Sequence, residues 1–250
     1  MATVPMAKVV ARVSTTTLAN DGTPMSVALI RLLHLASPTL PVGAYTYSQG
    51  LEWAVEAGVV RDEATALAWI GDVLELGVGR GEAVYLAHML AAWRDDDGDG
   101  DDAALARLDQ DFVASRESAE LRAETLQMGY SLKRLLGDLP DFPADRLAAF
   151  AQPSFPLAWS CAAAGWPIPP EDALAAYLWA WAENQVMAAL KSVPLGQTAG
   201  QRLLLALGER LPAIATAAVR APIEAAANFL PGLAIASSRH ETQYSRLFRS

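Results

Sequence analysis

"PEDALAAYLWAWAENQVMAALKSVP", residues 170–194, is the stretch that decides the fold class. Proline is tolerated in the first turn of a helix and disrupts its interior, so Pro170 marks a helix start and Pro194 closes the helix. Its apolar run "LAAYLWAWA" stops at Glu183, far short of the roughly 20 apolar residues that a membrane-spanning helix needs. We therefore predict a long buried helix of an all-α protein.

Helical periodicity continues along the chain from Ser26 onward, and no stretch is a convincing strand. The helices expected from this pattern cover residues 27–36, 45–57, 63–76, 82–93, 103–113, 117–136, 170–192 and 197–219, with short pieces between Pro140 and Pro156 and a last helix before the tail. We expect Gly77, Gly79 and Gly81 to break the chain and Pro212 to kink or split its helix.

The predicted architecture is a single all-α domain of about ten helices with no sheet, spanning residues 26–238. Residues 1–25 are predicted to be a disordered N-terminal extension, and residues 239–250 form a separate C-terminal tail. A composition of 52% hydrophobic and 19% charged residues suits a sizeable core.

Charge and cysteine content exclude several classes of function. The formal net charge is −9 and the pI is about 4.8, which argues against general binding to a nucleic-acid backbone. The one cysteine, Cys161, excludes an internal disulfide framework and a multi-cysteine zinc site. We expect a cytoplasmic protein that binds neither nucleic acid nor membrane.

Two patterns imitate known ligand sites. "GVGRGE" (77–82) carries Glu82 where a dinucleotide fingerprint needs its third glycine. The acidic run "RDDDGDGDD" (94–102) copies half an EF-hand loop, with Ala106 at the position of the bidentate glutamate. The same run contains Asp95, Asp96 and Asp99, the pattern of helical magnesium-dependent isoprenoid synthases, which we keep as the alternative function. No metal cluster and no catalytic residue are predicted.

Two further segments are conspicuous. In "LASPTLPVGAYTYSQGLEWAVEAG" (35–58), two prolines stiffen a loop, a glycine permits a tight turn and aromatic residues crowd together; the residues of this motif are Pro38, Pro41, Gly43, Tyr45 and Tyr47. An ordinary helix junction is the alternative reading. In "WAENQVMAALKSVPLGQTAGQRLL" (181–204), Lys191 is one of three lysines against sixteen arginines. This position either prefers a compact ammonium or simply lies near a helix C-terminus.

The tail "HETQYSRLFRS" (240–250) is unusually apolar and basic for a chain end. As a helix it would place Tyr244, Leu247 and Phe248 in one stripe, with Arg246 and Arg249 flanking it. Isolated helices below about 12–15 residues are marginal in water, so such a tail would gain order in a partner's groove. Packing against its own domain is the alternative.

These motifs together resemble the UreF family of urease accessory proteins. The resemblance covers about residues 29–250 and is most specific in "SSRHETQYSRLFRS", with "LASPTLPVGAYTYSQGLEWAVE" and "VPLGQTAGQRLL" in support. Ala44 and Thr46 stand where members usually have glycine and serine, a departure that affects the conformation of the loop and leaves the fold in place.

The resemblance implies a non-enzymatic, all-helical adaptor. It would bind the accessory protein UreD (also called UreH), recruit and regulate the GTPase UreG, and form a homodimer within an assembly that inserts nickel into the urease apoprotein. Nickel would be handled by that assembly, so no cofactor is expected here. The residues implied for UreD/UreH are Arg239, His240, Tyr244, Arg246, Leu247, Phe248 and Arg249. Glu52 and Lys191 are implied for the GTPase side, with activation and restraint of GTP hydrolysis both open.

Overall fold

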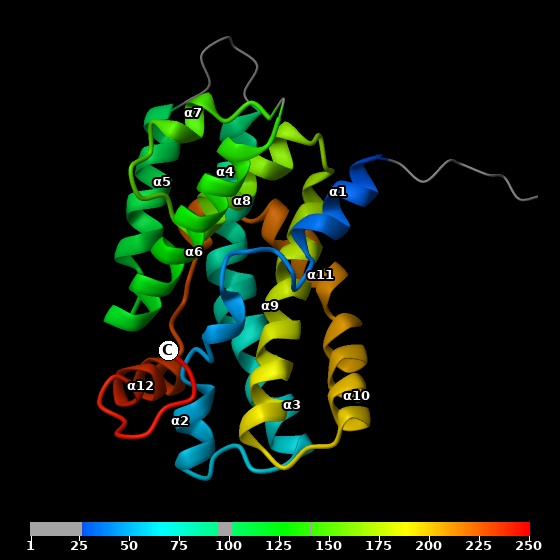
Figure 1. Cartoon of the computed structure of the whole chain (residues 1–250), viewed down its shortest axis with the longest axis vertical. Helices are drawn as coiled ribbons and strands as arrows, with labels where there is room; N and C mark the ends of the chain where they lie inside the picture. Colours follow the sequence, from blue (N-terminus) through cyan, green and yellow to red (C-terminus); the bar gives the residue numbers. More distant parts are fainter. Residues whose placement is uncertain (1–26, 95–101, 141) are drawn as a thin grey trace, which may run out of the picture.

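The computed structural model describes residues 27–94, 102–140 and 142–250 (Figure 1). The elements are α1 (Val27–Leu35), η1 (Ala44–Thr46), α2 (Leu51–Glu56), α3 (Glu63–Asp72), η2 (Val73–Glu82), α4 (Ala83–Trp93), α5 (Asp102–Ala114), α6 (Ala119–Asp138), α7 (Asp145–Ala148), α8 (Phe155–Gly165), α9 (Pro170–Ser192), α10 (Gln197–Gly208), α11 (Leu211–Arg220), η3 (Ile223–Ala225) and α12 (Pro231–His240). The predicted all-α class is confirmed, because no strand occurs among these residues.

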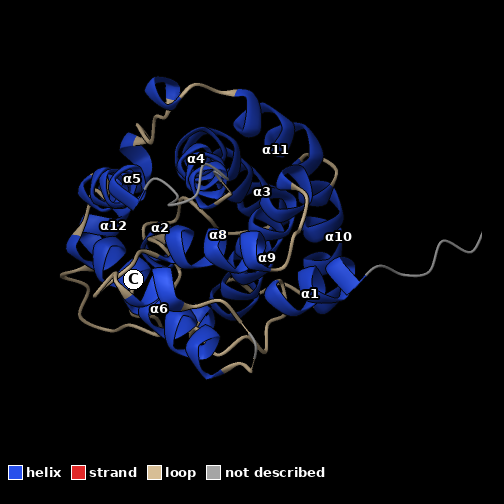
Figure 2. Cartoon of the chain, turned by 90° about the horizontal axis from the view of Figure 1, so that it is seen from above, coloured by secondary structure: helices blue, strands red, loops and turns tan. Residues whose placement is uncertain are grey.

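Helix α9 is the central element of the domain. It starts at Pro170 as predicted and contacts α1, α2, α3, α4, α8, α10 and α11. The view from above shows it surrounded by other helices (Figure 2). Small buried residues such as Ala182 and Ala189 let neighbouring helices approach closely. Tyr177 packs against the rings of Phe155 and Trp159, with ring centroids 5.5 and 5.2 Å away.

The predicted break at Gly77, Gly79 and Gly81 is wrong. α3, η2 and α4 form one continuous helix, in which η2 has the wider turns of a π-helix. A Cβ on Gly77 would lie 2.8 Å from Leu230 Cδ1, and a Cβ on Gly79 would lie 2.6 Å from Ile214 Cγ2. These glycines therefore serve close packing, and tertiary contacts offset their low helix propensity.

The predicted helix over residues 45–57 is also wrong in extent. Gln49 and Gly50 adopt positive φ values of 52° and 79° and separate η1 from α2. A Cβ on Gly50 would lie 3.0 Å from the backbone nitrogen of Ser237, so this turn brings α12 against α2. In contrast, the expected split at Pro212 is confirmed, since this proline lies in the first turn of α11.

Two expectations fall on residues that the structure does not describe, and the first of them is the N-terminal extension at residues 1–25. Asp95, Asp96 and Asp99, on which the magnesium-enzyme alternative depends, lie outside the described residues. Within the described part of the chain, every helix is too short or too polar to cross a membrane.

Helix α6 offers a matched test of the packing. A Cβ on Gly129 would lie 2.1 Å from the carbonyl oxygen of Pro153, whereas a Cβ on Gly137 meets nothing within 4 Å. Overpacking against backbone costs about 1–3 kcal/mol, so we expect Gly129→Ala to lower the free energy of unfolding in urea by at least that amount. Gly137→Ala should leave it unchanged or raise it by up to ~1 kcal/mol. Equal effects of the two changes would contradict this packing of α6 against the start of α8.

Candidate functional site

The tail, defined here as residues 241–250, folds back onto the body of the protein beside α2, α6 and α12 (Figure 1). Without a partner these residues form turns, bends and irregular segments and no helix, and the tail packs against its own domain, which is the alternative stated above. The helix expected in a partner's groove stays a prediction. The backbone N–H of Arg249 donates to the carbonyl oxygen of Thr46 at 2.8 Å, and the N–H of Ser48 donates to that of Ser250 at 2.7 Å. The motif loop and the tail thus satisfy each other's backbone groups, which removes the need for helical hydrogen bonds.

The Glu52 carboxylate, in the first turn of α2, binds the tail backbone. Its Oε1 accepts from the N–H of Leu247 at 2.7 Å, and its Oε2 accepts from the N–H of Phe248 at 3.0 Å. Oε2 also lies 3.2 Å from Nε2 of His240. A buried carboxylate is tolerated only when it is hydrogen bonded. Glu52 is 7% exposed, and within the described ranges all the partners of its carboxylate belong to the C-terminal segment.

His240 lies fully buried between two carboxylates. Its Nδ1 is 2.7 Å from Oε2 of Glu120, while its Nε2 faces Glu52. Arg246 approaches the other oxygen of the same carboxylate, with Nη1 2.6 Å from Oε1 of Glu120. Two carboxylates, an imidazole and a guanidinium therefore meet at the base of the tail.

Phe248 is the apolar anchor of the tail. Its side chain is 6% exposed, and Nζ of Lys191 lies 5.4 Å from the centre of its ring, within the range of a cation–π interaction. Tyr244 and Leu247 point the other way, with Leu247 73% exposed and Tyr244 fully exposed. The expected three-residue stripe is thus divided into one inward and two outward side chains.

A chain of hydrogen bonds leads from the tail into the interior. Ser250 Oγ donates to Oε2 of Glu124 at 2.8 Å, and Gln49 Nε2 donates to Oε1 of Glu124 at 2.7 Å. Trp181 Nε1 donates in turn to Oε1 of Gln49 at 2.8 Å. Burial raises the pKa of Glu124 from 4.5 to about 7, because these hydrogen bonds only partly offset the loss of solvent.

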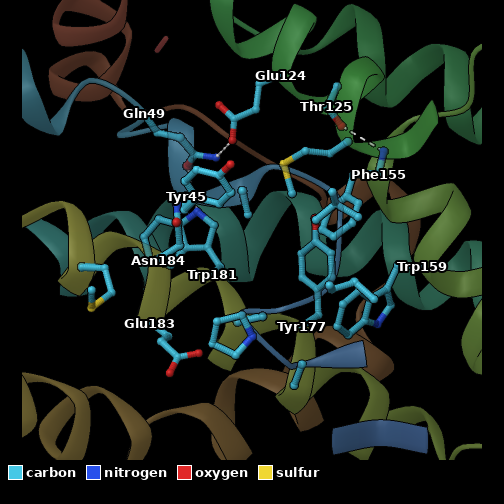
Figure 3. A pocket seen from close by; sticks show the side chains of 18 of the residues that line it. Tyr45, Gln49, Glu124, Thr125, Phe155, Trp159, Tyr177, Trp181, Glu183 and Asn184 are labelled. Atoms are coloured by element: carbon cyan, nitrogen blue, oxygen red, sulfur yellow. Dashed lines mark hydrogen bonds between the residues drawn. The ribbon is translucent and has the colours of Figure 1, made fainter. Parts of the chain in front are cut away.

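This chain borders a largely apolar cavity of about 280 Å³. Figure 3 shows Gln49 and Glu124 joined on one side of it and the rings of Phe155, Trp159 and Tyr177 gathered on the other. Behind them Glu82 accepts from Arg116 Nη1 at 3.1 Å and from the hydroxyl of Tyr177. Among the described residues, no three His, Cys, Asp or Glu side chains are placed to share a metal ion.

The structure brings most of the sequence-predicted site together. Glu52 and Lys191, expected on a GTPase face, both contact the tail. Of the motif loop, Pro38 and Tyr45 line the cavity, Gly43 makes the predicted tight turn with φ 80°, and Tyr47 is buried with its carbonyl bound to Asn184. Arg239 and Arg249 are exposed, as is Pro41. Sequence reasoning missed Glu120 and Glu124, which lie four residues apart on α6 and face the tail.

Comparisons with known proteins agree with these features. The family model described as UreF matches residues 60–208. A protein named urease accessory protein UreF from Azoarcus sp. (strain BH72) is 65% identical over 227 residues, covering 89% of this chain and 95% of the relative. The relative of the same name from Dechloromonas aromatica (strain RCB) is 59% identical over 229 residues, covering 89% and 97%. The one from Methylibium petroleiphilum is 50% identical over 229 residues, covering 90% and 95%.

The raised pKa of Glu124 predicts a pH-dependent stability. Between pH 4.5 and about 7 the folded protein holds a proton on this group that the unfolded chain has lost, so the free energy of unfolding falls as pH rises through that window. Glu124→Gln cannot ionise, so its free energy of unfolding should lack this fall. At ~1.4 kcal/mol per pKa unit, we expect the difference in the free energy of unfolding in urea between Glu124→Gln and the wild type to grow by on the order of 2 kcal/mol from pH 5 to pH 8. The exposed Glu171→Gln serves as control. A parallel pH profile for Glu124→Gln and the wild type would contradict the assignment.

Proposed function

The chain belongs to the UreF family of urease accessory proteins, which support urease maturation, and we propose that it is the cytoplasmic, non-enzymatic adaptor of that process. In this proposal it binds UreD/UreH through its tail, recruits and regulates the GTPase UreG, and acts as a homodimer in an assembly that inserts nickel into the urease apoprotein. Nickel is the cargo of the assembly and not a resident cofactor.

The observation that supports the proposal most strongly is the outward face of the tail. Tyr244 and Leu247 project into solvent while the backbone beside Leu247 is fixed by Glu52, and Arg246 and Arg249 carry positive charge next to them. Tyrosine and arginine are typical of residues that dominate binding energy. A tail already ordered in the free protein loses less conformational entropy on binding, which favours affinity.

Lys191 supports the GTPase side of the proposal. It lies in the last turn of α9 with its residue exposed, and it presents a compact ammonium beside the tail. A positive charge supplied by a regulator can stabilise charge that develops on a transferring phosphoryl group. The same contact can instead hold the GTPase in one nucleotide state, so the proposal includes both activation and restraint. The isoprenoid-synthase alternative finds no support in the comparisons.

The tail face is tested by Tyr244→Ala combined with Leu247→Ala. Because both side chains are exposed, we expect unfolding in urea to shift by less than about 0.5 kcal/mol. Capture by immobilised UreD/UreH should weaken at least ~10-fold, the loss expected when exposed anchors worth over ~1.4 kcal/mol are removed. Leu205→Ala, at a residue that is 70% exposed on α10, is the matched control. Undiminished capture of the double variant would refute the proposed tail surface.

The GTPase side is tested at Lys191. In the complete assembly, we expect Lys191→Ala to change UreG recruitment or the rate of GTP turnover, since the ammonium is removed. Lys191→Arg keeps the charge and separates the need for charge from the need for a compact group. If Lys191→Ala alters neither recruitment nor turnover, the GTPase assignment of this residue is wrong.

A further inference from the structure

We propose that Glu52 is a positioning residue that acts from inside the fold: it fixes the register of the tail and so determines which tail side chains reach the partner proteins. The inference rests on the proposed function of the tail, and it replaces direct contact between Glu52 and the GTPase, which the family resemblance had suggested.

Burial and hydrogen bonding leave Glu52 nothing to offer a partner directly. The residue is 7% exposed, and its two oxygens already face three donors, the amides of Leu247 and Phe248 and the imidazole of His240. A partner could reach these oxygens only after the tail had left. Within the folded chain, any influence of Glu52 on another protein therefore passes through the C-terminal segment.

Glu52 binds two backbone amides of the tail and none of its side chains. The contact therefore fixes the register of the tail, that is, which of its residues face the protein. Exposed and buried residues alternate at the end of the chain, since Leu247 and Arg249 are exposed while Phe248 and Ser250 are buried. A slip by one residue would reverse this pattern, bury Leu247 and expose Phe248. The two hydrogen bonds that Glu52 accepts from adjacent amides oppose such a slip and keep Leu247 outward.

The same register sets the position of Lys191. Its ammonium lies over the ring of Phe248, so a displaced tail would remove the ring from beneath it. The two surfaces that the proposed function assigns to different partners are therefore parts of one contact network centred on Glu52. One substitution at Glu52 should disturb both surfaces, although Glu52 touches neither partner.

The hydrogen bonds between Glu52 and the tail amides are tested by hydrogen exchange on the isolated full-length chain. Glu52→Gln keeps the size of the side chain but presents an amide N–H₂ where an acceptor is needed. We expect the amides of Leu247 and Phe248 to exchange at least ~10-fold faster, as local opening becomes easier, while the amide of Val186 in the core of α9 keeps its rate. Glu56→Gln is the matched control, one turn further along α2 and exposed.

A second variant protects the test against a general loss of folding. Leu247→Pro removes one donor from the tail side and leaves Glu52 intact. It should accelerate exchange at Phe248 in the same way, because Glu52 then holds one tail amide instead of two. Unchanged exchange at residue 248 in both variants, with Val186 still protected, would overturn the inference.

Partner binding separates this inference from the proposed function. If Glu52 acts through the tail, Glu52→Gln should weaken capture by UreD/UreH at least ~10-fold in the wild type and less than ~2-fold in the Tyr244→Ala, Leu247→Ala background. Additive losses in the two backgrounds would overturn the positioning role. If Glu52→Gln accelerates amide exchange in the tail but no tail variant alters capture by UreD/UreH, Glu52 still fixes the register of the tail and the proposed partner surface is wrong.

Discussion

A carboxylate buried in the first turn of α2 must be hydrogen bonded, and among the described residues only the C-terminal segment supplies its partners. Glu52 is therefore the point on which the site depends, because satisfying its charge fixes the last residues of the chain. The requirement works in both directions, since the tail is too short to order itself and finds its partners in Glu52, Thr46 and Ser48. Arg246 offsets the negative charge of Glu120, whose other oxygen lies against the imidazole of His240.

The helical framework determines where that contact can form. The left-handed turn at Gln49 and Gly50 ends the motif loop and lets α12 approach α2 closely, which carries His240 to Glu52. Glu124 on α6 extends the network inward through Gln49 to Trp181 on the central helix α9. The tail is thus connected to the cavity through side chains and not through backbone alone. A partner that moves the tail would change the hydrogen bonds at the cavity wall.

The sequence predicted the fold class and most of the residues that form the site, but it did not predict how those residues are arranged. Helical period and prolines identify α9 and the split at Pro212 correctly, because both signals are local. The three glycines of η2 were misread, since their close neighbours are Leu230, Ile214 and Ala227, all far away in the sequence. The conformation of the tail was not predicted for the same reason, because it depends on contacts between residues far apart in the sequence. Its donors pair with a glutamate nearly two hundred residues earlier, and no local pattern reports such a pairing.

The most direct measurement of the central claim is limited trypsin digestion of the isolated, full-length protein, followed by mass spectrometry of the C-terminal fragments. Trypsin needs a mobile backbone around Arg246 and Arg249, and both arginines are exposed while the backbone beside them is hydrogen bonded. The account predicts that cleavage at these two sites is slow without any partner and becomes fast in Glu52→Gln. Rapid cleavage at both sites in the wild-type protein would show that the tail is not held by Glu52 and would contradict the account.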